Sequence, residues 1–478
     1  LRIAPFEPQA YSVTSPPVVV NGVVITGSSI GDNSRPDPAS GEVRGYDART
    51  GQLRWTWDPI PQDPRDPAYP EWRGAFAQKG GGANAWSTLV ADAERDLVFV
   101  PTGSAAPDYY GALRLGGNRY ANSIVALRAT TGRLVWAFQT VHHDVWDYDN
   151  ATPPALVTIT RNGRDVAAVL QATKTGMLFV LDRESGRPIF PVEERRVPAS
   201  DIPDEQTSRT QPFTAVTPPL SPHRFTDDQI WGITEADRAA CRAVMTPLRN
   251  EGIFTPPSTQ GTLLMPARIG GANWGRVAID PMRQIAVVAV NRIAEMVQLI
   301  PRDGFDLARA RANEPTRLGD DFEYNMMRGT PYVVRRRLLL APSRLPCTPP
   351  PFGALVAIDL KTGLKAWDTP LGSMTSIVSP DILKQTSPDW GSVNLGGAVA
   401  TAGGVVFAGG SLDRRLHAYD VETGRELWSG ELPASAKATP AIYRIASGAE
   451  LVVVAAGGGG AWGAGDYLVA FRVPDDRR

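Results

Sequence analysis

Short apolar runs rich in Val, Ile and aromatic residues recur along the chain, separated by turns, which predicts β-strands rather than helices. One longer pattern recurs with them. An apolar strand is followed by Asp, by a turn ending in Thr-Gly or Ser-Gly, and by an aromatic residue four positions after the Gly. It occurs five times, as GYDARTGQLRW, ALRATTGRLVW (with Arg128 in place of Asp), VLDRESGRPIF, AIDLKTGLKAW and AYDVETGRELW. Each copy predicts a β-hairpin.

The chemistry of the turn explains the pattern. The Asp side chain bonds to the turn backbone, the Gly takes a positive φ, and the aromatic residue begins the next strand, facing a neighbouring sheet. We therefore expect these aromatic residues to be packing residues buried between sheets: Trp55, Trp136, Phe190, Trp367 and Trp428.

A second pattern completes the predicted architecture. Segments 85–103, 273–290 and 394–410 each read as two strands around a tight turn. Joined to the hairpins, they predict four-stranded antiparallel sheets arranged radially, an all-β propeller. The turn glycines lie 81, 54, 177 and 61 residues apart (Gly51, Gly132, Gly186, Gly363 and Gly424). We expect the long interval to hold a further unit around Asp280 and an irregular Pro-rich excursion over 197–266, giving about six blades in one domain, 1–478.

Composition narrows the function classes. The 46 Gly, 42 Pro and 12 Trp among 478 residues suit short strands joined by turns. Lys plus Arg (49) nearly equals Asp plus Glu (50), with no block of one sign, which argues against a nucleic-acid groove or a polybasic membrane surface. No apolar run is long enough for a membrane helix. A small-molecule ligand is expected.

The two cysteines, Cys241 and Cys347, lie 106 residues apart and belong to no CxxC motif. This argues against a thiolate zinc site and covalent haem. Either one disulfide or two buried thiols fits the sequence. We expect the two cysteines to lie away from the cofactor and to form no redox relay.

Several unusual segments carry a family resemblance: TVHHDVWDYD, QATKTGMLFVLDRESG, EGIFTPPSTQGTLLMP, LPCTPPPFGALVAIDLKTG, LPASAKATPAIY and AGGGGAWGAGDYLVAF, in this order. They resemble the membrane-bound glucose and quinate dehydrogenases that depend on pyrroloquinoline quinone (PQQ). The resemblance implies a quinoprotein propeller with eight blades in the complete fold, of which this chain is expected to lack the first. It also implies Ca²⁺ or Mg²⁺, oxidation of a sugar or cyclic polyol hydroxyl, a ubiquinone-type acceptor and a periplasmic location.

The resemblance assigns the chemistry to two residues. Asp147 matches the family's catalytic base, which removes the hydroxyl proton. Lys174 matches the basic residue that hydrogen-bonds the quinone oxygens. From the sequence alone, the cluster Asp144, Asp147 and Asp149 also reads as a solvated loop, and Lys174 as a surface residue of a turn.

The same comparison gives a metal set of Asp32, Asn33 and Asp147, since Ca²⁺ and Mg²⁺ prefer oxygen ligands. A plain Asp-Asn turn is the alternative. Remaining cofactor contacts are expected from Trp86, as the stacking platform, and from Arg44, Asn394, Trp390 and Trp462.

Two further points bear on function. His142 and His143 are adjacent, so we expect hydrogen-bonding or pocket-lining roles rather than a shared metal ion. Gly459 stands where glucose-oxidising relatives carry a His, which puts glucose itself in question. The alternative to an enzyme is a non-catalytic binding or assembly scaffold. The sharpest prediction is that Asp147, Lys174, Asp32, Asn33 and Trp86 converge at one end of the propeller channel.

Overall fold

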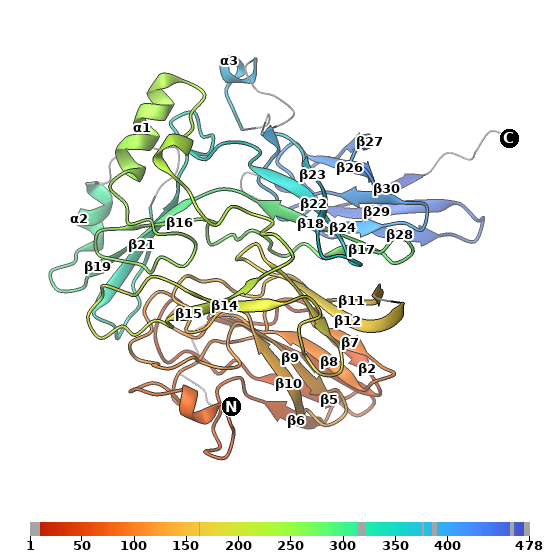
Figure 1. The fold of residues 1–478 in the computed structure, drawn as a ribbon, viewed down its shortest axis with the longest axis horizontal. Helices are drawn as coiled ribbons and strands as arrows, with labels where there is room; N and C mark the ends of the chain where they lie inside the picture. Colours follow the sequence, from red (N-terminus) through yellow and green to blue (C-terminus); the bar gives the residue numbers. More distant parts are fainter. Residues whose placement is uncertain are drawn as a thin grey trace.

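In the computed structural model, which describes residues 10–161, 163–313, 322–374, 377–384, 390–458 and 463–472, antiparallel sheets dominate (Figure 1). The first repeat sheet contains β2 (Val18–Val20), β3 (Val23–Thr26), β5 (Val43–Asp47) and β6 (Leu53–Trp57). The second contains β7 (Val90–Asp92), β8 (Leu97–Pro101), β9 (Ser123–Arg128) and β10 (Leu134–Gln139). The third contains β11 (Ala155–Arg161), β12 (Arg164–Ala172) and β13 (Leu178–Asp182).

Three more repeat sheets follow along the chain. The fourth contains β17 (Ala278–Asp280), β18 (Ile285–Asn291), β22 (Gly353–Asp359) and β23 (Lys365–Pro370). The fifth contains β24 (Ala398–Ala400), β25 (Val405–Ala408), β26 (Arg415–Asp420) and β27 (Glu426–Glu431). The sixth contains β28 (Ala441–Arg444), β29 (Glu450–Ala456) and β30 (Tyr467–Arg472). The predicted four-stranded antiparallel sheets are confirmed; the number of blades stays a prediction.

A separate sheet, here called the inserted sheet, contains β16 (Thr262–Leu264), which precedes β17. Its other strands lie between β18 and β22: β19 (Glu295–Pro301), β21 (Tyr332–Leu338) and β20 (Glu323–Asn325). Our expectation that the segment with Asp280 forms a unit of its own is wrong. Asp280 ends β17, which shares the fourth sheet with the AIDLKTG hairpin. The glycine interval is long because this insertion separates strands of one sheet.

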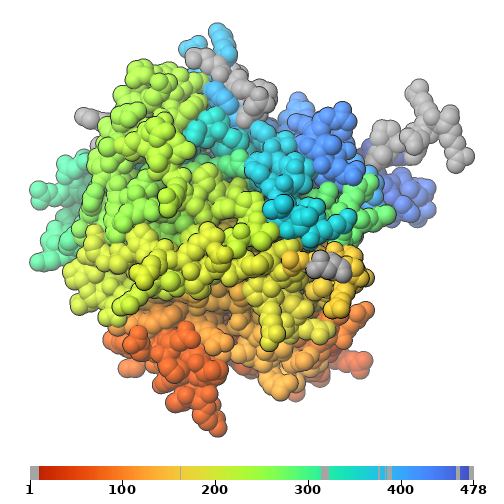
Figure 2. All heavy atoms as spheres, in the orientation of Figure 1, coloured from red at the N-terminus to blue at the C-terminus, as the bar shows by residue number. Residues whose placement is uncertain are grey.

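The remaining elements are small. Two-stranded pairs are formed by β1 (Tyr11–Ser12) with β4 (Ser29–Ile30) and by β14 (Val192–Arg196) with β15 (Thr210–Thr214). The helices are η1 (Tyr69–Glu71), η2 (Asp227–Gln229), α1 (Glu235–Met245), α2 (Leu307–Ala312) and α3 (Pro380–Leu383). In the described ranges no helix is both long and apolar enough to cross a membrane. In Figure 2 the yellow-green and green residues of segment 197–266 spread across the middle and upper left of the visible face.

Consecutive repeat sheets are joined by one recurring contact. The Trp55 indole donates to the Ala129 carbonyl at 3.0 Å, and a methyl group added to Gly132 would lie 2.5 Å from its ring. Equivalent ring-on-glycine contacts join the next sheets: Trp136 with Gly186, Phe190 with Gly363, and Trp367 with Gly424. Each of these aromatic residues is at most 9 % exposed, as predicted.

Trp428 departs from this pattern, because it is 41 % exposed, so the prediction of burial is wrong for it. Within the described part of the sheet that follows, no turn glycine lies against its ring. The ring contacts Phe471 edge-on instead, with centroids 5.0 Å apart.

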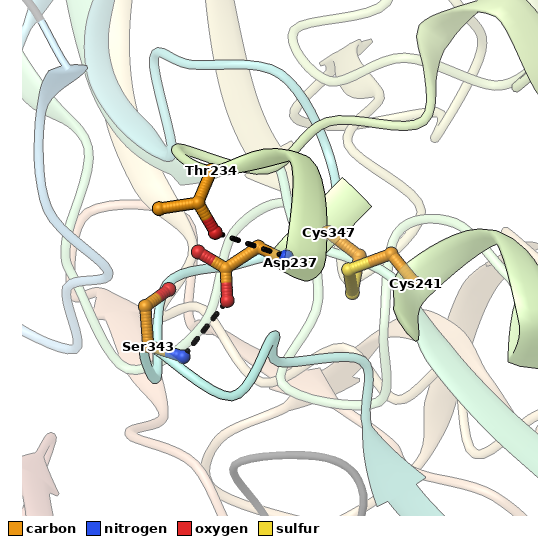
Figure 3. Close-up of a disulfide and its surroundings, with 5 residues drawn as sticks. All are labelled: Thr234, Asp237, Cys241, Ser343 and Cys347. Carbon is orange, nitrogen blue, oxygen red and sulfur yellow. Dashed lines mark hydrogen bonds between the residues drawn. A yellow bond between two sulfur atoms is a disulfide. The ribbon is translucent and has the colours of Figure 1, made fainter. Parts of the chain in front are cut away.

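A disulfide joins Cys241 of α1 to Cys347, with 5.6 Å between the Cα atoms, and so decides between the two alternatives (Figure 3). One turn earlier in α1, Asp237 accepts a hydrogen bond from the Ser343 backbone at 3.1 Å. Helix α1 is therefore fastened twice to the segment after β21. Both cysteines lie in an apolar cluster with Phe225 and Met265 that contains none of the predicted site residues.

Candidate active site

The loop after β10 carries Asp147 and is fixed by its aromatic neighbours. The Trp146 indole donates to the Thr255 carbonyl and the Tyr148 hydroxyl to the Pro266 carbonyl, each at 2.8 Å. Both rings are fully buried. Asp147 itself lies between these anchors with φ of 63°, a conformation that turns the chain sharply. The loop is therefore rigid around its carboxylate.

The acidic cluster of this loop is buried, so the solvated-loop reading is wrong. Asp144 is 2 % exposed and accepts hydrogen bonds from the Ser104 hydroxyl and, at 3.2 Å, from the Tyr148 backbone. Asp149 is 4 % exposed and accepts from the Ser104 backbone at 2.7 Å. Buried carboxylates need such donors.

Lys174, in the turn between β12 and β13, holds this loop from the third repeat sheet. Its ammonium donates to Asp147 Oδ1 at 2.8 Å, to the Asp147 carbonyl at 2.9 Å and to Asp149 Oδ2 at 2.7 Å. All three ammonium hydrogens are thereby used. The side chain is only 6 % exposed, so Lys174 is not a surface residue.

The other oxygen of Asp147 meets a second cation. Oδ2 accepts from the Tyr109 hydroxyl at 3.2 Å and from Arg336 at 3.4 Å. Arg336 belongs to β21 of the inserted sheet, and also donates to Tyr109 at 2.6 Å and to Glu323. Burial alone would raise the pKa of Asp147, but Lys174 and Arg336 outweigh it and hold that pKa below its usual range.

Further carboxylates lie within electrostatic reach. Burial, opposed by Lys174 and reinforced by Asp147, raises the pKa of Asp149 to about 6. Burial and the charges of Asp149 and Asp147 raise the pKa of Asp32 well above its usual range. The pKa of buried Asp108 is raised in the same way, by burial and then by Asp32 and Asp147. The cluster therefore contains more carboxyl groups than its two cations can pair with, and the surplus groups resist ionisation.

Trp86 lies beside this cluster and is half-buried. The Lys174 ammonium is 5.8 Å from the centroid of its ring. Trp274 packs edge-on against it, with centroids 4.9 Å apart. Three segments distant in sequence, carrying Trp86, Asp147 and Lys174, are therefore brought together.

The other predicted residues are placed less directly. Asn33 follows Asp32 in a turn and is half-buried. Arg44 is paired with Glu42 at 2.6 Å and with the Tyr11 hydroxyl at 3.0 Å. Since Tyr11 pairs with Ile30, Arg44 is held on the Asp32 side of the first sheet.

Two further predicted cofactor contacts, Asn394 and Trp390, are held by neighbours in their own part of the fold, and a third lies outside the described residues. Asn394 is 3 % exposed and donates to the Val290 carbonyl at 3.0 Å. Trp390 packs edge-on against Trp231, with centroids 5.3 Å apart. Within the described part of the chain, neither Asn394 nor Trp390 hydrogen-bonds to or stacks on the Asp147 cluster. Trp462 lies outside the described residues, as does Gly459.

Both histidines of the loop are satisfied by neighbours. His143 is buried between the Gly116 carbonyl and Glu205, each at 2.7 Å. His142 contacts Gln139 at 2.8 Å and Glu194 at 3.0 Å. They do not share a site, as the sequence predicted.

Sequence reasoning missed Tyr109, Asp108 and Arg336. Arg336 stands in a run of three arginines on a strand of the insertion, where no repeat pattern marks it. The alternation of buried and exposed positions expected along a strand would not single out Arg336, because its neighbour Arg337 is buried as well. The segment around Asp108 and Tyr109 carries no hairpin signature.

Comparison with known proteins gives the family. The model of the "PQQ: Glucose/ethanol/alcohol dehydrogenase, beta-propeller domain" matches residues 2–452. The chain belongs to this family.

Curated relatives extend the match. Quinoprotein glucose dehydrogenase A of Acinetobacter calcoaceticus is 39 % identical over 98 % of this chain and 58 % of its own length. The quinate/shikimate dehydrogenase (quinone) of Acinetobacter baylyi is 35 % identical over 96 % of this chain and 57 % of its own. The chain thus spans somewhat more than half the length of these relatives.

A solved structure supports the fold. The quinohemoprotein alcohol dehydrogenase from Comamonas testosteroni superimposes with a TM-score of 0.62 at 25 % identity, over 94 % of this chain and 56 % of that one. The quinoprotein propeller class predicted from the sequence is therefore confirmed.

Proposed function

We propose that this chain is the larger part of a PQQ-dependent dehydrogenase that oxidises a hydroxyl group of a sugar or cyclic polyol. The observation that carries the proposal is the Asp147 carboxylate held between Lys174 and Arg336 beside the ring of Trp86. The relatives named for glucose and for quinate support this substrate class. Residues 1–478 are proposed to act as one cofactor-binding domain, with 197–266 as an excursion from it.

The donor set fits the cofactor. When bound, PQQ supplies the quinone carbon that accepts hydride from the alcohol carbon. Trp86 offers a flat aromatic surface with the Lys174 ammonium nearby, over the ring, which suits a planar anionic ligand. Lys174 already uses all its hydrogens on Asp147 and Asp149, so it would exchange one of these bonds to reach a quinone oxygen.

The residues of the chain account for the proton. Asp147 is ionised because two cations face it, so its carboxylate is ready to accept the hydroxyl proton. Tyr109 and Arg336 hold Oδ2, and Lys174 holds Oδ1, which fixes the direction in which the base faces. Burial of the surrounding aromatic residues excludes water from the reacting atoms.

A hard divalent cation, Ca²⁺ or Mg²⁺, also fits, because the carboxyl groups of Asp32, Asp108 and Asp149 lie within electrostatic reach of one another and buried Asp108 Oδ1 has no hydrogen-bond partner among the described residues. Among the described residues no three His, Cys, Asp or Glu side chains share one point. The proposed metal-coordinating residues are Asp32, Asn33 and Asp147. Oxygen atoms of the bound small molecule would therefore complete the coordination. Arg44, Asn394, Trp390 and Trp462 remain proposed cofactor contacts.

Electron transfer to a membrane ubiquinone-type acceptor and a periplasmic location are part of the proposal, by analogy with the family. A disulfide joining Cys241 and Cys347 suits an oxidising compartment. The scaffold alternative is not favoured, because the named relatives are dehydrogenases and because the base Asp147, its partner Lys174 and the aromatic platform Trp86 are all present.

Reconstitution tests the proposal. The chain is incubated with PQQ and either Ca²⁺ or Mg²⁺, and reduction of an artificial dye is followed with glucose, quinate, shikimate and glycerol. We expect turnover of at least one polyol that requires both PQQ and the metal. PQQ binding without turnover of any polyol would favour the scaffold.

A further inference from the structure

A cavity of about 720 Å³ opens beside the candidate site. Its lining comes from segments that precede the first strand of different repeat sheets: Thr14, Pro16, Thr88, Pro153, Trp274, Arg276, Leu395, Lys437, Ala438, Thr439 and Pro440. Since β2 contacts β7, β11 contacts β17 and β17 contacts β24, these segments gather around the propeller axis. The volume suits a small organic ligand.

The cavity adjoins the Asp147 site through aromatic contacts. Trp274 lines the cavity and packs edge-on against Trp86. Thr14, also in the lining, donates to the Trp86 carbonyl at 2.8 Å. Trp274 therefore lies between this cavity and the Trp86 ring beside Lys174.

The charge of this lining has one sign. Arg276 and Lys437 are its only charged residues, and the lining contains no Asp or Glu. Arg276 precedes β17 of the fourth sheet and Lys437 precedes β28 of the sixth, so two separate sheets bring these side chains to the same cavity. A cavity lined by one sign of charge concentrates ligands of the opposite sign.

Lys437 also lies against the loop in which this sequence departs from its relatives. Gly457 donates to the Ser435 carbonyl at 3.0 Å, which draws this loop to the Lys437 segment. A methyl group on Gly458 would lie 3.0 Å from the Lys437 ammonium nitrogen. Gly458 directly precedes Gly459, the position at which glucose-oxidising relatives carry a His.

We propose that Arg276 and Lys437 form a carboxylate-binding subsite of the axial cavity. The planar guanidinium and the ammonium together suit one carboxylate group. Two molecules could supply it: an acidic cyclic polyol such as quinate, or PQQ itself. The position of Lys437 beside Gly458 favours the substrate. This inference rests on the proposed function for the nature of the ligands.

The test compares binding of matched ligands to four variants. Arg276→Gln, Lys437→Gln and the double variant remove charge from the cavity. Arg65→Gln and Lys365→Gln together provide the control, because both side chains are exposed and neither lines this cavity. PQQ affinity is measured by fluorescence titration of the unloaded protein. Quinate and its uncharged methyl ester are then titrated calorimetrically into the PQQ-loaded protein.

If the substrate supplies the carboxylate, each single variant weakens quinate binding about tenfold, leaving the methyl ester and PQQ unchanged. If the cofactor supplies it, PQQ affinity falls by about the same factor, and both polyols respond alike. In either case the loss diminishes as salt is raised, because salt screens the charges.

Unchanged affinity for both PQQ and quinate in the double variant overturns the subsite. It is also overturned if the wild-type protein binds quinate and its methyl ester equally well and the variants bind PQQ as tightly as the wild type does. Because these experiments measure binding and not turnover, they test the carboxylate subsite separately from the proposed dehydrogenase function. Charge-selective binding with no turnover of any polyol refutes the proposed function and leaves the subsite standing.

Discussion

The two oxygens of Asp147 are held by two regions of the molecule that are built differently. One is formed by the repeat sheets, here called the repeating half, and the other by the inserted sheet, here called the inserted half. Oδ1 is held by Lys174, which sits in a turn of the third repeat sheet, where the strands follow the recurring pattern. Oδ2 is held by Arg336 and Tyr109, of which Arg336 comes from the inserted sheet. The repeating half builds a position that the sequence pattern reveals, while the insertion adds a second cation that no pattern marks.

The largest effect on activity is expected for Asp147, because residues of both halves hold its carboxylate. Asp147→Asn keeps the shape and removes the base, so turnover should fall by about 10²–10⁴. PQQ binding should survive. Steady-state dye reduction and fluorescence titration measure the two quantities, and an Asn variant with normal turnover would exclude Asp147 as the base.

The halves should differ in their contribution to stability. Lys174→Gln leaves Asp147 and Asp149 buried without their shared cation, and should lower the free energy of unfolding by about 3–5 kcal/mol. Arg336→Gln should cost less, about 1–3 kcal/mol, because its partner Glu323 is half-exposed and regains water. Urea unfolding compares them.

A control variant sharpens this comparison. Adding Asp149→Asn to Lys174→Gln removes one unpaired carboxylate and should recover part of the loss. A larger cost for Arg336→Gln than for Lys174→Gln would mean that the insertion, rather than the repeat, carries the cluster.

The disulfide should act mainly on the inserted half, because the loop between Cys241 and Cys347 contains the whole inserted sheet. Cys241→Ser with Cys347→Ser should lower the free energy of unfolding by about 2–4 kcal/mol. Hydrogen exchange should increase in β19 and β21 more than in β12 and β13. Equal increases in both pairs would contradict this division.

The smallest effect concerns His417 of β26, which lies in the fifth repeat sheet and not in the Asp147 cluster. It contacts Asp413 at 3.2 Å and Glu426 at 3.0 Å. Burial alone would lower its pKa, but these carboxylates outweigh it and raise the pKa to about 9. Its contribution is therefore complete below the unfolded value of about 6.5 and lost as pH rises through about 9.

His417→Gln should accordingly cost roughly 1–2 kcal/mol at pH 6 and little at pH 10. Unfolding measured at both values checks the sign. A cost that grows with pH would show that the imidazole is neutral in the folded protein.

The sequence predicted the repeating half well for a physical reason. Residues such as Trp55 and Gly132 mark a strand start and a turn locally, and the pattern is repeated often enough to be recognised. Asp147 and Lys174 were predicted because they lie in sequence segments that resemble the family. Arg336 and Asp108 escaped because burial and charge pairing depend on which distant strands meet. Trp428 was misjudged for the same reason: its environment is set by the neighbouring sheet, and its own sequence context matches that of Trp367.

The ring-on-glycine joint has a direction, since the aromatic residue always belongs to the earlier sheet and the glycine to the later one. A sheet joined on both sides therefore presents its turn glycine to the preceding sheet and its aromatic ring to the following one. Duplicating the coding segment for one sheet would produce a unit that already fits both of its new neighbours. Growth of the ring by whole repeats needs no redesign of the existing joints, whereas the inserted sheet, lacking this pair, had to find its own contacts.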